Sequence, residues 1–240
     1  MFWKEWRELR RTRGGLAGAL VSVILPLGLL GIILPWQFGD AWLETPAGLG
    51  FWCWTALLAV VPHGADGIAG ERERHTLETL LATPLPDHAI LLGKIAAVVL
   101  HGWTMGTASA LLALAAVNLG HWDGALRLYP PAVFAAGALL CALSAALGAL
   151  AGTLFSLRAP TVRQAQQALG ALVLSLALAP PLLEGLVPAR WWSGREAAGG
   201  PVAVAPVAAL VLGLLALGLI DSLLFLAALR RFQRHRLLLD

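Results

Sequence analysis

Four ionisable side chains stand inside long apolar stretches of the sequence, where a charge lacks water to solvate it. His63 and Asp66 are three residues apart and would share one helix face, while His101 and Asp221 stand in later apolar stretches. Ionisable groups at such depth face the interior of a helix bundle or line a water-filled path. Two interpretations stay open. Asp66, His101 and Asp221 form a polar path for substrate or protons, or they pair within the bundle or with lipid headgroups.

The same residues do not predict a metal site or a catalytic centre. His63 and Asp66 are too few ligands for a metal such as zinc, and Cys53 and Cys141 have no metal-type spacing. No nucleophile can be placed beside a base. The chain also lacks the G-x-x-x-x-G-K-S/T loop that binds ATP phosphates. We therefore expect no metal, no cofactor and no catalytic residue in this chain.

The elements that position these side chains are apolar helices. Of the 240 residues, 58% are hydrophobic and only 13% are charged, whereas a soluble domain carries roughly 25% charged residues. The hydrophobic residues form continuous runs of about 20, the length of a helix that crosses the bilayer. The sequence predicts an all-α integral membrane protein, one domain over residues 1–240. The predicted spans are Leu16–Pro35, Leu49–Ala69, Ala89–Val117, Tyr129–Phe155, Ala165–Leu183 and Val202–Leu229.

The basic residues predict how these spans are oriented. Fourteen of the 17 Lys and Arg residues fall on one side: in the N-terminal segment, around the loops after the second and fourth spans, and at the C-terminus. Short basic segments stay in the cytoplasm, so we predict a multi-pass protein with both termini cytoplasmic. Met1–Arg13 carries apolar and basic residues on separate faces, which predicts an amphipathic helix in the lipid interface. This placement favours the lipid bilayer, not nucleic acid, as the partner of the basic residues.

The loop between the second and third spans, residues 70–88, carries the most information. It begins with a mixed-charge run, Glu71-Arg72-Glu73-Arg74, that is too polar to enter lipid. Thr76 could cap a short helix, Glu78 would favour its first turn, and Pro84 would end it. Its apolar stripe is Leu77, Leu80 and Leu81. A helix of about eight residues is too short to be stable alone, so it needs a partner protein or the membrane face to pack on.

The loop resembles that of permease subunits of the type-2 ABC exporter family. Those permeases have six spans, cytoplasmic ends and a charged stretch after the second span that continues with Thr-Leu-Glu, a leucine pair, Thr-Pro and Gly-Lys. The matching residues here are Glu71, Arg72, Glu73, Thr76, Leu77, Glu78, Leu80, Leu81, Thr83, Pro84, Gly93 and Lys94. One departure is His75, where the family commonly has glycine, and it puts the local backbone conformation in question.

The resemblance implies a coupling helix that docks into a groove of a separate cytosolic ABC ATPase. Leu77, Leu80 and Leu81 would be its anchors, between Thr76 and Pro84. The polar contacts at the rim of the groove would come from Glu71, Arg72, Glu73, Arg74 and Glu78. ATP and magnesium would bind the partner ATPase. The alternative is that this segment is only a capped connector on the membrane surface.

The implied function is the membrane-spanning subunit of an ATP-driven exporter that works by alternating access. A second permease, identical or different, would complete the translocation path in a bacterial-type inner or plasma membrane. Two alternatives stay open: a haem-exporter-type permease of cytochrome maturation, which has a similar loop, and a six-span channel or scaffold without an ATPase.

Overall fold

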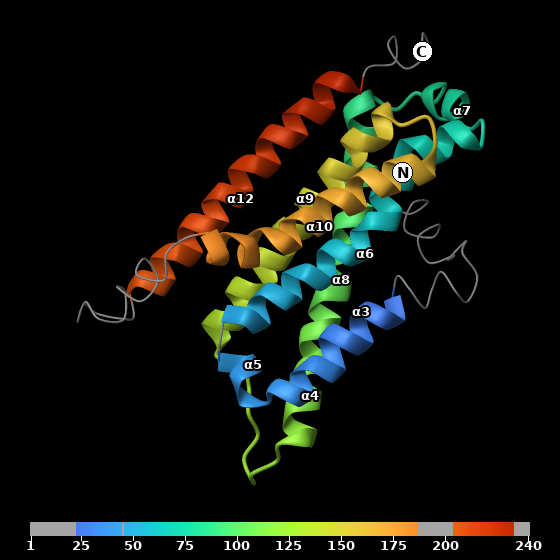
Figure 1. Cartoon of the computed structure of the whole chain (residues 1–240). Coiled ribbons are helices and arrows are strands. Elements are labelled where there is room, and N and C mark those ends of the chain that lie inside the picture. Colours follow the sequence, from blue (N-terminus) through green and yellow to red (C-terminus); the bar gives the residue numbers. More distant parts are fainter. Residues whose placement is uncertain (1–22, 45, 187–203, 233–240) are drawn as a thin grey trace.

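The computed structural model describes residues 23–44, 46–186 and 204–232. Every regular element in these ranges is a helix, which confirms the all-α prediction (Figure 1). The predicted interfacial helix Met1–Arg13 lies outside the described residues. The five long helices are α6 (Pro46–Glu73), α8 (Asp87–Gly120), α9 (Pro131–Arg158), α10 (Val162–Leu186) and α12 (Val204–Arg231).

Four of these helices are long and apolar enough to cross a membrane, over Gly48–Glu73, Asp87–Gly120, Pro131–Arg158 and Val211–Arg231. They cover the predicted second, third, fourth and sixth spans. The helix α10 covers the predicted fifth span. A shorter apolar helical segment covers the later part of the predicted first span. The chain is therefore a multi-pass membrane protein, and the count of six spans stays a prediction.

The segment of the first predicted span differs from a plain helix that ends at Pro35. It consists of α3 (Leu25–Gly28), the π-helical turn η2 (Leu29–Ile33) and α4 (Leu34–Phe38). Pro35 lies in the first turn of α4, where a missing N–H group is tolerated. The helix ends instead at Gly39, whose φ of 56° is left-handed, before the short α5 (Asp40–Glu44).

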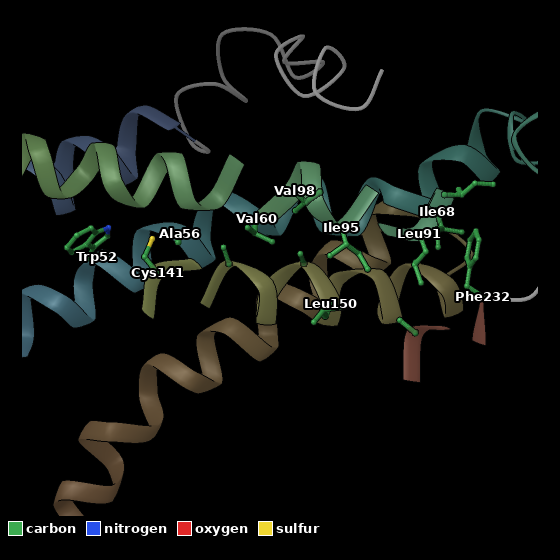
Figure 2. Close-up of a cluster of buried hydrophobic side chains, with 14 of the residues drawn as sticks. Trp52, Ala56, Val60, Ile68, Leu91, Ile95, Val98, Cys141, Leu150 and Phe232 are labelled. Carbon is green, nitrogen blue, oxygen red and sulfur yellow. The ribbon is translucent and has the colours of Figure 1, made fainter. Parts of the chain in front are cut away.

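The helix α6 is central, because it packs against α8, α9 and α10. The main apolar cluster runs along α6, α8 and α9 to the end of α12 (Figure 2). Its labelled members are Trp52, Ala56, Val60, Ile68, Leu91, Ile95, Val98, Cys141, Leu150 and Phe232. The short helix α7 (Leu77–Leu81) lies at one end of the bundle, and α5 lies at the opposite end (Figure 1).

Glycine sets the distance between α6 and α9. A Cβ atom built on Gly152 would lie 2.9 Å from the Cα atom of Gly64 and 2.8 Å from its carbonyl carbon. Backbone atoms cannot move aside as a flexible side chain can. Small residues let membrane helices approach closely and gain van der Waals contact. The contact of α6 with α9 therefore requires a residue without a side chain at position 152.

We predict that Gly152→Ala lowers the unfolding temperature of the purified protein, because overpacking costs about 1–3 kcal/mol. Gly67→Ala is the matched control on α6, since a Cβ atom at Gly67 meets nothing within 4 Å. Tryptophan-fluorescence melting in one detergent would compare both variants with the native chain. Equal melting of the two variants would contradict the close helix contact.

Candidate functional site

Glu71 is the centre of the loop between α6 and α8. It lies in the last turn of α6 and is 2% exposed. One carboxylate oxygen accepts from Lys94 Nζ of α8 at 3.1 Å, and the other accepts from the hydroxyl of Thr76. The backbone carbonyl of Glu71 also accepts from the Thr76 N–H at 2.9 Å. Glu71 thus joins the start of the loop, the residue before α7, and α8.

The next two charges tie the end of α6 to the connection between α9 and α10. Arg72 donates to the carbonyl of Ala159 at 2.9 Å. Glu73 accepts from the backbone N–H of Val162, the first residue of α10, at 2.7 Å. An acidic group at the start of a helix is favoured by the helix dipole. Arg72 and Glu73 therefore bind this chain's own neighbouring helices.

The backbone at His75 turns the chain from α6 into α7. Its φ of 54° is left-handed, a conformation that costs an L-residue roughly 1–2 kcal/mol and that glycine adopts freely. This is the position at which the resembling permeases commonly have glycine. The structure therefore keeps the turn that glycine favours, and His75 adopts it under strain.

The helix α7 spans only Leu77–Leu81, so it is shorter than the predicted helix of about eight residues. At its start the Thr76 hydroxyl donates to the carbonyl and the carboxylate of Glu71. After Leu81, Thr83 and Pro84 follow, and a residue before proline is pushed out of the α conformation. The helix therefore ends before the predicted point.

The predicted contact residues for an ATPase fall into three groups. Glu71 and Leu77 are buried inside this chain, and Leu77 belongs to the main apolar cluster. Both side chains stabilise the loop from inside this chain. The sequence instead predicts Leu77 as an anchor in the ATPase groove and Glu71 as a polar contact at the rim of that groove. Glu73, Thr76, Glu78 and Pro84 are exposed, and Arg72 and Arg74 are half-buried. The side chains of Leu80 and Leu81 lie outside the described set.

The intramembrane ionisable residues separate into two pairs and one isolated group. Asp66 forms an ion pair with Arg74 at 3.2 Å. His63 and His101 meet edge to face, with their ring centroids 4.6 Å apart. Asp221 is 8% exposed on α12, and no hydrogen bond or ion pair of the described residues joins it to Asp66 or His101. Within the described residues no group of three or more His, Cys, Asp or Glu could hold a metal.

Sequence reasoning missed two residues that hold the loop. The sequence places Lys94 in the Gly-Lys part of the loop motif, but it does not identify Lys94 as the partner of Glu71. A lysine at the start of an apolar helix signals a need for a partner, so this pair had a sequence signal. Ser156 of α9 had none. Its hydroxyl accepts from the backbone N–H groups of Ile68 and Ala69, at 2.9 and 2.7 Å.

The helical bundle and its apolar spans define a multi-pass integral membrane protein. The chain matches the model of the ABC-2 family transporter protein over residues 1–190 of 240. It belongs to that family, the type-2 ABC transporter permeases. Proteins of this family form the transmembrane part of a transporter and generally work with a cytosolic ATPase. No curated protein matches the chain.

We predict that Glu71→Gln lowers the unfolding temperature strongly, because it removes the negative charge that pairs with Lys94 in a buried position. Breaking a buried pair on one side costs about 3–5 kcal/mol. The double variant Glu71→Gln, Lys94→Met should recover most of the loss. Asp123→Asn is the control, since its partner Arg127 is part of an exposed pair worth about 0–1 kcal/mol. Equal unfolding temperatures of Glu71→Gln and Asp123→Asn would contradict a buried Glu71–Lys94 pair.

Proposed function

We propose that this chain is the permease subunit of an ATP-driven exporter. The segment Glu71–Pro84 transmits the closure of a separate cytosolic ATPase to the spans. Family membership supports the transporter part of this proposal. The observation that carries the coupling part is the buried Glu71–Lys94 ion pair at 3.1 Å. Through it, the segment that presents α7 is joined to two spanning helices.

The contacts around Glu71 make the loop suitable for transmitting force. A push on α7 reaches α6 and α8 through Thr76, Glu71 and Lys94. It reaches α9 and α10 through Arg72 and Glu73. A loosely attached connector would absorb such a displacement by bending. A connector fixed by a buried charge pair and by hydrogen bonds to the neighbouring helices moves as one body with the helix ends, as alternating access requires.

The contact surface for the ATPase is assigned to the outward side of this segment. Glu78 and Pro84 are exposed there, and we propose Leu80 and Leu81 as the apolar anchors. Arg72 and Arg74 contribute half-buried charge at the rim. Because Glu71 and Leu77 face inward, their role in coupling is to position the segment. ATP and magnesium bind the ATPase, since this chain has no phosphate-binding loop.

The assembly follows from the same proposal. Six spans and an interfacial helix at Met1–Arg13 place both termini and the segment Glu71–Pro84 in the cytoplasm of an inner or plasma membrane. The distribution of the basic residues supports this orientation. Two permeases, identical or different, enclose the translocation path between them, and two ATPases drive it.

We predict that Leu80→Asp uncouples ATP hydrolysis from transport and weakens ATPase binding by about 10- to 100-fold, because a groove anchor contributes about 1.5–3 kcal/mol. The measurement is the amount of ATPase that co-purifies with the tagged permease. Its transport-coupled hydrolysis would be measured in proteoliposomes. The control is Leu126→Asp, an equally charged change at a residue that is 64% exposed in the connection between α8 and α9.

Membrane insertion should be unchanged in both variants. Normal ATPase binding and coupling by Leu80→Asp would remove the coupling assignment. Conductance of the permease alone in planar bilayers, without ATP, would instead identify a channel.

A second prediction tests the orientation. In a variant with Cys53 and Cys141 replaced by alanine, Leu126→Cys should react with a membrane-impermeant maleimide in intact cells. Glu78→Cys should react only after the membrane is permeabilised, because α7 and the connection that holds Leu126 lie at opposite ends of the bundle (Figure 1). The reverse labelling pattern would place α7 outside the cell and would end the coupling proposal.

A further inference from the structure

The helix α12 is packed tightly at one end and loosely over the rest of its length. At the end near α7, Ala228 and Phe232 are 0% and 2% exposed. Further back, a Cβ atom built on Gly213 or Gly218 would meet nothing within 4 Å. Only 11% of its spanning window is buried, against 39–50% for the other three candidate spans. The described residues therefore leave most of the middle of this helix uncovered.

Asp221 stands where the packing of α12 begins to open. It lies midway between Val211 and Arg231, about 15 Å from either end of the span at the helical rise of 1.5 Å per residue. The residue is 8% exposed, and both carboxylate oxygens are shielded without a hydrogen-bond partner among the described residues. An isolated carboxylate in such a place has a high desolvation cost unless a cation or a proton neutralises it.

Two other acids on the described helices have counter-charges within this chain. Glu71 is paired with Lys94, and Asp66 with Arg74. Asp221 differs from both of them. Charged residues inside spans otherwise pair with one another or mark the route of an ion or substrate. The missing counter-charge thus points to a ligand that brings its own positive charge.

The surroundings of Asp221 define the chemistry of that ligand. The residues one turn away on the same face are Leu217, Gly218, Leu224 and Phe225. Within the described residues, no group of three or more His, Cys, Asp or Glu could hold a metal ion there, and calcium and magnesium need several oxygen ligands. A single carboxylate among apolar side chains suits a weakly hydrated monocation. The ring of Phe225 adds a face that attracts cations.

We propose that Asp221 binds the charged group of an amphiphilic organic monocation, such as a quaternary or protonated amine or a phosphonium with apolar substituents. The ligand enters from the bilayer through the space beside Gly218, and it reaches the carboxylate when α12 moves from the neighbours that shield both oxygens in this structure. Its charge pairs with the carboxylate, and its substituents contact the leucine side chains of this face. The inference rests on the proposed export function only in calling this ligand a substrate.

The test measures equilibrium binding of radiolabelled tetraphenylphosphonium to the purified permease in nanodiscs, without any ATPase. Asp221→Asn should weaken binding by about tenfold or more, and Asp221→Glu, which keeps the charge, should bind within about threefold of the native chain. Neutral triphenylmethane should partition equally into both preparations. No binding by the native chain, or equal binding by Asp221→Asn, overturns the proposal.

A second readout separates a bound cation from a proton alone. A carbodiimide adds to a protonated carboxyl group in an apolar setting, and tetraphenylphosphonium should slow its reaction at Asp221. Unchanged labelling would overturn the proposal and leave Asp221 as a proton carrier. Because neither measurement uses ATP, their failure is distinguishable from failure of the coupling segment, which the Leu80→Asp experiment detects.

Discussion

The close approach of α6 to α9 is the constraint on which the rest of the structure depends. Lipid tails are as apolar as leucine, so membrane helices associate through van der Waals packing and polar contacts. Gly64 and Gly152 bring the two backbones together. One turn further, the Ser156 hydroxyl can reach the N–H groups of Ile68 and Ala69. These two hydrogen bonds fix the last turns of α6, and Glu71 is thereby held where Lys94 can meet it. The loop between α6 and α8 is a continuation of the bundle core.

Hydropathy predicted the long helices well, because their formation in lipid is imposed by the need to satisfy every backbone group. It predicted the end of the first span poorly. Pro35 looks like a helix end, but the π-helical turn Leu29–Ile33 places it in a first turn, where proline is accepted. The true end at Gly39 depends on a left-handed backbone, which composition does not reveal. Local propensity therefore locates a helix more reliably than its ends.

For the loop between α6 and α8 as well, the sequence predicts which residues are present but not which of them are buried. Its charges, its leucines and the presence of a helix-ending proline could be recognised in the sequence, although α7 ends at Leu81, before Pro84. The sequence does not show which of these side chains face the interior of the chain. Leu77, Leu80 and Leu81 share one apolar stripe, and yet Leu77 packs into the core of this chain. Burial of one member depends on where α8 and the end of α12 lie, and that placement is tertiary. The same applies to Glu71, whose role is set by Lys94, 23 residues away.

Glu71 and Asp221 represent two opposite uses of a buried carboxylate. The first is satisfied by a lysine and a hydroxyl of the same chain, so its charge contributes to a fixed geometry. The second lies on a loosely packed helix with neither partner among the described residues. A leucine at position 221 would pack at lower cost in lipid, and several neighbouring positions of α12 are leucine. The proposed cation would supply the positive charge that Asp221 lacks among the described residues, and its departure would restore the carboxylate for the next ligand.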